Sequence, residues 1–136
     1  MLQVIIYTNS DGGVSIVRPT GEITLEEVIA KDVPAADYEV INAADVPVDR
    51  LFRSAWRKGT GKIDVDVTAS KLIAHDIRRA KRDAEFSPLD IQATIPAKAL
   101  EAESKRQAIR NKYDEMQSAI DKASTTDEIK IILGVA

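Results

Sequence analysis

The chain is poor in the residues that carry much of enzyme and metal chemistry, because it has no cysteine and a single histidine. Without cysteine it has no disulfide framework, no thiolate metal site and no thiol nucleophile. His75 alone cannot supply a two-histidine metal site, and any Ser-His-Asp arrangement has to use this one residue. We therefore expect no catalytic residue, no metal site, no cofactor and no enzymatic activity.

Long hydrophobic runs and a strong charge of one sign are also missing. No segment approaches the roughly 18 apolar residues that span a bilayer, and no basic region followed by an apolar run opens the chain. The net charge of −3 lacks the basic balance of a dedicated nucleic-acid binder. The 136 residues, 44% of them hydrophobic and 30% charged, are typical of a soluble globular protein. We expect no contact with a membrane.

Residues 1–57 show the pattern of a small β-β-α-β unit. Two β-branched runs flank Gly12 and Gly13, which supply the positive φ angles that a hairpin turn requires. Thr24 and Glu27 have the spacing of a capping box, which predicts the start of a short helix. We expect strands at residues 4–7, 14–17 and 38–41, and a helix that ends by Pro34.

Phe52 and Trp56 lie at the end of this unit, and their spacing of four places both rings on one helical face. We expect the pair to anchor the N-terminal unit to the helical half. The alternative is an exposed aromatic anchor for a partner. Residues 58–67 are expected to form a hinge and an extended segment, because Gly59 and Gly61 weaken regular structure. The same glycines lack the spacing of a phosphate-binding P-loop.

Five titratable residues have both a chemical and a structural interpretation. Asp64 and Asp66 alternate with apolar residues, so both carboxylates lie on one side of an extended segment. Such a pair can hold a divalent cation, but the polar face of a half-buried strand is the favoured interpretation. Asp45 and Asp49 are interpreted as loop and cap residues in preference to an acid-base pair. His75 is interpreted as a solvated residue in preference to a catalytic one.

From residue 68 onward the apolar period is helical. Four residues recur at alternating steps of four and three and form one stripe: Ile73, Ile77, Ala80 and Ala84. A break is expected around Pro88, because proline disfavours helical geometry in the residue before it. A second helix is expected after Pro96. A short last helix is expected between Thr125, which has a capping-box partner at Glu128, and Gly134.

The second helix carries a heptad pattern, which Arg106 interrupts at one inward position. Its apolar positions are Ala102, Ile109, Tyr113, Met116, Ile120 and Ala123. These patterns predict an α+β fold in which the small β-β-α-β unit is followed by a helical hairpin over residues 68–136. The alanine-rich seam buries little apolar area, so the hairpin is only modestly stable unless a partner covers it. We expect self-association or partner binding through Ile109, Tyr113, Met116 and Ile120.

The first of these helices carries a basic cluster made of Arg78, Arg79, Lys81 and Arg82. Acidic neighbours interleave with it and weaken the field that nucleic-acid phosphate would meet. A solvated helix face is the favoured interpretation, followed by protein binding and then by nucleic acid. We keep these four residues as candidate partner-binding residues and expect no nucleic-acid binding.

Four segments follow one another in a recognisable order: residues 1–17 with the Gly-Gly turn, the Phe-Arg-Ser-Ala-Trp element at 52–56, the arginine-rich helix at 66–81 and a closing helical segment at 126–133. This order resembles small proteins encoded in the tail modules of tailed bacteriophages. Those proteins carry a Phe-Arg-x-Ala-Trp element near the middle, followed by a Val-Asp-x-x-x-(Ala/Ser)-x-x-Ile helix.

The resemblance implies a non-enzymatic bacteriophage tail protein, similar to a tail assembly chaperone, that acts in virion assembly by binding other phage tail proteins. One alternative is a structural subunit that is retained in the tail or baseplate. An alternative of another class is a phage regulatory or counter-defence protein that binds a host factor or nucleic acid through the basic helix. The expected location is the host cytoplasm during assembly, or the virion.

Overall fold

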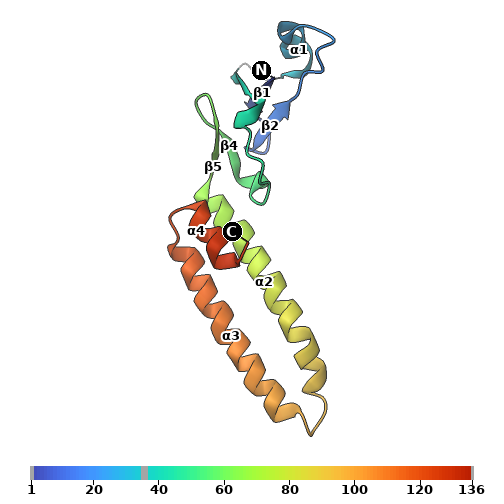
Figure 1. The fold of residues 1–136 in the computed structure, drawn as a ribbon, viewed down its shortest axis with the longest axis vertical. Helices are drawn as coiled ribbons and strands as arrows, with labels where there is room; N and C mark the ends of the chain where they lie inside the picture. The colour runs from blue at the N-terminus through green and yellow to red at the C-terminus, as the bar shows by residue number, and fades with distance from the viewer. Residues whose placement is uncertain (1, 35–36, 136) are drawn as a thin grey trace. The chain divides into compact units, whose positions relative to one another are not determined.

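The computed structural model describes residues 2–34 and 37–135, and the fold is α+β, as predicted. Short strands form two small sheets in the N-terminal part, and the C-terminal part is helical (Figure 1). The chain divides into two compact units, residues 1–66 and 67–136. The division falls after Asp66, near the end of the segment that the sequence indicates as a hinge.

The N-terminal unit is built on a three-stranded antiparallel sheet with β1 in its centre. Strand β1 (Gln3–Thr8) pairs with β2 (Val14–Val17) along one edge and with β3 (Tyr38–Asn42) along the other. In the register of the sheet, Ile5 lies beside both Val17 and Val40. The three predicted strands are therefore confirmed, and β1 holds the sheet together.

The turn between β1 and β2 is organised by Asn9. Its side-chain Oδ1 accepts hydrogen bonds from the backbone N–H groups of Asp11 at 3.1 Å and Gly13 at 3.0 Å. Gly12 has a φ of 83°, a conformation that glycine adopts without steric cost. The hairpin predicted from the two glycines is confirmed.

Helix α1 (Leu25–Asp32) connects β2 to β3 and begins at the predicted cap. Thr24 Oγ1 accepts a hydrogen bond from the backbone N–H of Glu27 at 3.2 Å. The same hydroxyl donates to the Glu27 carboxylate at 3.1 Å, so the two side chains close the first turn. The helix ends before Pro34, which agrees with the sequence prediction.

A second hairpin, which the sequence pattern does not predict, follows the third strand. Strand β4 (Trp56–Lys58) pairs antiparallel with β5 (Ile63–Val65). The backbone N–H of Gly59 donates to the Lys62 carbonyl at 2.9 Å and closes the turn. A Cβ atom on Gly59 would meet the Asp64 carboxylate, and this exposed side chain would have to move aside. The expected hinge glycines thus form a hairpin turn.

Trp56 lies in the core of the N-terminal unit, where its side chain is only 1% exposed. The other buried members of this cluster are Val4, Ile6, Val14, Ile41 and Val46. The Arg53 guanidinium lies over the indole, with its carbon 4.6 Å from the ring centroid, and it donates to the Val14 carbonyl at 2.8 Å. Burial, followed by the charge of Arg50, lowers the pKa of Arg53.

Phe52 and Trp56 do not share a helical face, which corrects the sequence prediction. Phe52 precedes a single 3-10 turn (Arg53–Ala55), and Trp56 begins strand β4, because the chain becomes extended after one turn. Both side chains are buried, which does not fit the alternative of an exposed aromatic anchor. The structure places Trp56 against apolar residues of its own unit.

The helical unit contains α2 (Val67–Gln92), α3 (Ala99–Lys122) and α4 (Thr126–Leu133). Helices α2 and α3 pack side by side, and α4 packs against both (Figure 1). The break expected around Pro88 is wrong, because α2 continues through this residue. Proline removes one backbone donor, yet the next residue, Leu89, is buried, so packing holds the last turn in place.

The buried side of α2 is not the stripe that the sequence indicates. Its buried residues are Ser70, Ala74, Arg78 and Leu89, whereas Ala80 and Ala84 are exposed. Helix α3 agrees better with its heptad pattern, since Ala102, Tyr113, Ile120 and Ala123 are buried. The predicted helix is therefore present, but Ala80 and Ala84 do not lie on its buried side.

The predicted last helix is confirmed at both ends. Thr125 Oγ1 accepts from the backbone N–H of Glu128 at 3.2 Å. Gly134 has a φ of 75°, and the N–H of the next residue, Val135, donates to the Lys130 carbonyl at 3.0 Å. This is the hydrogen bonding of a glycine-terminated helix.

Candidate functional site

Polar side chains of α2 contact α3 and α4 at several levels, and together we call these contacts the polar seam. The seam consists of Lys71 with the Asp121 carbonyl at 2.9 Å, His75 with the Asp121 carboxylate at 2.8 Å, Lys81 with the Leu133 carbonyl at 2.7 Å, Glu85 with Lys112 at 3.1 Å and Asp90 with Arg106 at 3.2 Å. The seam therefore follows α2 along most of its length.

His75 is the second seam residue along α2, and both of its ring nitrogens have partners. Its Nδ1 accepts from Arg78 Nε at 3.3 Å, so the ring proton lies on Nε2 and is donated to Asp121. Only 13% of the His75 side chain is exposed, so its interpretation as a solvated residue is wrong. The arrangement positions α2 against α3.

Arg78 is 3% exposed, which is rare for arginine and requires nearby compensation. Burial is the largest cause that lowers the Arg78 pKa, and the neighbouring cations Arg79 and Arg82 lower it further. Asp121 and Asp114 act in the opposite direction. Arg78 is therefore an internal residue of the helical unit.

The basic cluster is divided between internal contacts and the surface. Lys81 donates to a carbonyl at the C-terminal end of α4, where the helix dipole favours a cation. Arg79 pairs with Asp76 at 3.0 Å, and Arg82 lies 3.8 Å from Asp83. Only Arg79 and Arg82 remain toward solvent, each beside an aspartate, and this leaves a weak field for phosphate.

Tyr113 and Glu85 are coupled across the two long helices. Burial, together with the hydrogen bond to Glu85, raises the pKa of Tyr113 to about 12. Hydrogen bonds from Tyr113 and Lys112 lower the pKa of Glu85. Tyr113 is thus an internal residue with its hydroxyl satisfied.

The four apolar residues proposed from the heptad pattern as a binding face are not equally accessible. Tyr113 and Ile120 are buried within the helical unit, whereas Ile109 and Met116 are half-buried. A partner cannot reach the first two without opening the hairpin. Tyr113 and Ile120 therefore contribute to the packing of α3 and do not form an exposed binding face.

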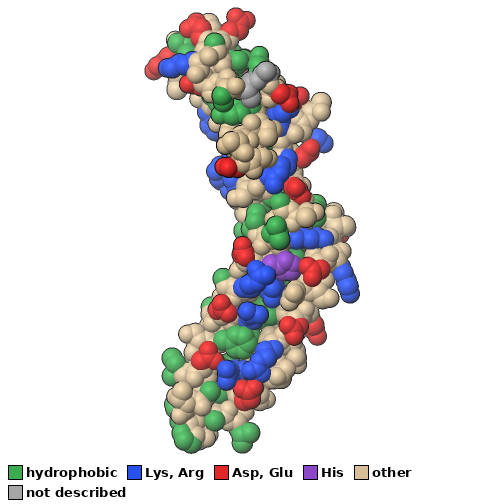
Figure 2. All heavy atoms as spheres, turned by 180° about the vertical axis from the view of Figure 1, so that it is seen from behind, with side chains coloured by type: hydrophobic (Ala, Val, Ile, Leu, Met, Phe, Trp, Pro, Cys, Tyr) green, Lys and Arg blue, Asp and Glu red, His purple; other side chains and the backbone are tan. Residues whose placement is uncertain are grey.

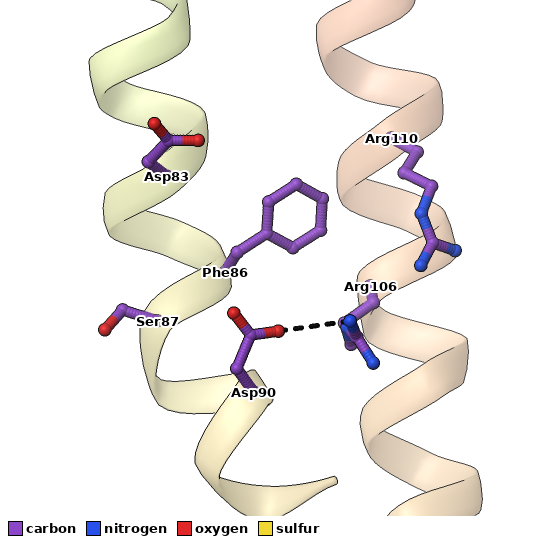
Figure 3. A pocket seen from close by; sticks show the side chains of 6 residues that line it. All are labelled: Asp83, Phe86, Ser87, Asp90, Arg106 and Arg110. Atoms are coloured by element: carbon purple, nitrogen blue, oxygen red, sulfur yellow. Dashed lines mark ion pairs between the residues drawn. The ribbon is translucent and has the colours of Figure 1, made fainter.

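A pocket opens between the distal parts of α2 and α3, where the Phe86 ring points toward α3 (Figure 3). Its lining residues are Asp83, Phe86, Ser87, Asp90, Arg106 and Arg110. Arg106 pairs with Asp90 and, at 3.2 Å, with Glu103, which also pairs with Arg110 at 2.9 Å. The interrupted heptad position is therefore occupied by an arginine whose charge is matched, which leaves the pocket little attraction for an anion.

The acidic candidates have neighbours of their own. Asp64 lies 3.4 Å from Lys62, and Asp66 lies 3.9 Å from Arg57. The Asp49 carboxylate accepts from the backbone N–H of Leu51 at 2.9 Å, as a loop-capping residue does. Within residues 2–34 and 37–135, no three His, Asp or Glu side chains are grouped so that they could hold a metal.

Three exposed large apolar side chains of the helical unit surround the connection between α2 and α3. Leu100 is 90% exposed, Ile91 is 66% exposed, and Ile95 between them is also exposed. Figure 2 shows hydrophobic atoms gathered at this end of the helical unit. We call Ile91, Ile95 and Leu100 the apolar tip.

Comparison with protein-family models, curated proteins and solved structures finds no match for this chain. In the part of the chain that the structure describes, no helix combines the length and apolar character needed to cross a bilayer. The function is therefore inferred from the surfaces described above and from the resemblance of the sequence motifs.

Proposed function

We propose that this chain is a non-enzymatic bacteriophage tail protein that acts in virion assembly by binding other tail proteins, and that the apolar tip is its main contact with them. The order of the sequence motifs supports the phage setting. The tip supports binding by a protein, because exposed clusters of large apolar side chains mark interaction sites on soluble proteins.

The apolar tip is the main observation behind this proposal, because its exposed side chains do not contribute to the stability of the helical unit. Covering one leucine completely is worth about 2 kcal/mol, and Leu100 is almost fully exposed. A partner with an apolar groove would recover that free energy for all three side chains. The protein then acts in the host cytoplasm during assembly, or in the virion if it stays bound.

The regulatory alternative that uses nucleic acid has less support. Arg78 is buried and Lys81 is bonded to α4, so half of the basic cluster already has internal partners. Binding to DNA or RNA would depend mainly on Arg79 and Arg82. Binding that is lost steeply with added salt would revive this alternative.

The test is a pull-down of phage proteins from infected-cell lysate with the wild type, Leu100→Ser and a matched control, Leu72→Ser. Leu72 is also a highly exposed leucine of the helical unit, but it lies near the start of α2. We expect Leu100→Ser to lose the retained tail protein and Leu72→Ser to keep it. If both variants retain the tail protein equally, the apolar tip is not the contact.

Mass spectrometry of purified virions separates the two roles within this class. Absence of the chain from the particle supports an assembly factor that leaves. Presence at a fixed copy number supports the structural subunit. Retention of no phage tail protein by the wild-type chain, with absence from the virion, would contradict both.

A further inference from the structure

Helix α2 carries a second regular stripe that the helical unit does not use. The four residues of the predicted stripe continue at the same steps of four and three to a six-residue set, which we call the open stripe: Ile73, Ile77, Ala80, Ala84, Ser87 and Ile91. Alternating steps of four and three are the spacing of a coiled-coil seam.

The open stripe lies on the side of α2 that faces away from α3. At 3.6 residues per turn, its six residues fall within about 40° of one line along the helix. The residues that contact α3, such as His75, Glu85 and Asp90, centre on roughly the opposite side. The stripe residues from Ala80 onward are exposed, and the first two are half-buried. The monomer therefore leaves the stripe largely uncovered.

We propose that a second copy of this chain covers the open stripe, with the two α2 helices paired in parallel. In a parallel pair each stripe residue meets the same residue of the other copy. Isoleucines then meet at both ends of the stripe, while Ala80 and Ala84 allow the helices to approach closely between them. The stripe is thus complementary to itself in size.

The charged residues beside the open stripe favour a second copy of the chain as the partner, and they favour parallel pairing of the two helices. Asp76 and Asp83 follow one flank at an interval of seven, and Lys81 lies on the other flank. The Lys81 ammonium donates to the Leu133 carbonyl within its own chain and keeps two further N–H donors. Parallel pairing places Asp76 of one copy against Lys81 of the other, which is the attractive arrangement of coiled-coil flanks. An antiparallel pair that aligns the same stripe would place Asp83 against Asp83 and Lys81 against Lys81. Like charges in these positions disfavour it.

This inference goes beyond the proposed function and does not depend on it. The two share Ile91, which the second copy covers, so in the dimer a tail protein contacts Ile95 and Leu100. A parallel pair has one consequence for that function. Both apolar tips lie at the same end of the paired helices, so one dimer presents two copies of Leu100 to a partner. Two linked contacts bind more tightly than one when the partner can engage both.

The first test measures association of the purified full chain by sedimentation velocity over a range of concentrations. We expect a dimer in the wild type. Ala84→Glu should weaken it at least about 100-fold, because it buries two facing carboxylates. Ala108→Glu is the matched control, since Ala108 is an exposed alanine on α3. Circular dichroism verifies that both variants keep their helices.

A wild type that stays monomeric at its highest soluble concentration would overturn the proposal, as would equal dimerisation of the two variants. An Ala84→Glu variant that is monomeric but still retains tail protein in the pull-down separates this inference from the proposed function. Loss of dimerisation and loss of partner binding are therefore distinguishable outcomes.

The second test determines direction and uses the absence of cysteine, since any disulfide must come from an introduced thiol. Under mild oxidation, Ser87→Cys should form a covalent dimer, because the two copies of this residue face each other in a parallel pair. Ser104→Cys, at an exposed position on α3, should stay monomeric. Cross-linking only in a mixture of Ile77→Cys and Ser87→Cys would show an antiparallel pair and contradict the proposal.

Discussion

Each of the two units is stabilised internally by a different kind of contact. The N-terminal unit packs large apolar side chains around Trp56, and this core draws residues from all three strands of its sheet. In the helical unit, the buried side of α2 is made mostly of small or polar residues, with the charged Arg78 among them. Hydrogen bonds and ion pairs of the polar seam take the place of much apolar packing there.

The difference indicates where each unit uses its apolar residues. The isoleucines of α2 are Ile73, Ile77 and Ile91, and all three lie on the open stripe, where the first two are half-buried and the third is exposed. A unit stabilised by apolar burial would bring such residues inside. The helical unit is therefore suited to binding through its outer surface, and the N-terminal unit to standing as a folded support.

The largest expected effect concerns the apolar core. Trp56→Ala removes a side chain that is almost completely buried and should lower the free energy of unfolding of the N-terminal unit by about 3 to 5 kcal/mol. Urea denaturation followed by circular dichroism measures it. In the wild type, the emission of this single tryptophan should be that of a buried indole. Emission typical of a fully hydrated indole would contradict the claim that Trp56 lies in the apolar core of the N-terminal unit.

A smaller effect is expected from the polar seam. Asp121→Ala removes the acceptor of the His75 hydrogen bond and one of the acidic neighbours of buried Arg78. We expect the free energy of unfolding of the helical unit to fall by about 2 kcal/mol. Asp76→Ala is the control, because within the chain Asp76 pairs with exposed Arg79 and its loss should change the stability of the helical unit little. Equal losses in urea denaturation would show that the seam does not stabilise the unit.

The smallest effect is expected from Tyr113. Tyr113→Phe removes one hydroxyl hydrogen bond to Glu85 and should cost about 1 kcal/mol near neutral pH. The folded pKa of about 12 lies above the unfolded value of about 10. The contribution of the hydroxyl is therefore complete below about pH 10 and is lost as the pH rises through about 12. Urea denaturation across this range should show a steeper loss in the wild type than in the variant.

Local patterns predicted much of the fold. The Gly12-Gly13 turn, the Thr24 cap and the Thr125 cap each depend on a few neighbouring residues, and all three are found in the structure. The β4–β5 hairpin was missed because its strands are only three residues long and its glycines also suggest a hinge. Short strands carry too few residues for an alternating pattern to be recognised.

The candidate site was less predictable, because periodicity identifies a stripe but not the element that covers it. Ile73 and Ala84 share a helical face in the sequence, yet α3 packs on another side, where Arg78 is buried. Burial of this arginine depends on Asp121 and His75 meeting across two helices. That contact joins residues far apart in the chain, and no local spacing indicates it.

The central claim is that the open stripe of α2 is uncovered in the monomer and becomes covered by a second copy. Hydrogen exchange of the purified chain at low and high protein concentration tests this claim most directly. We predict that amides of α2 near Ala84 become more protected as concentration rises, because a second copy covers the open stripe. Amides of β1 in the closed N-terminal unit should exchange at the same rate throughout. Concentration-independent exchange in α2, or an equal increase of protection in β1, would contradict the account.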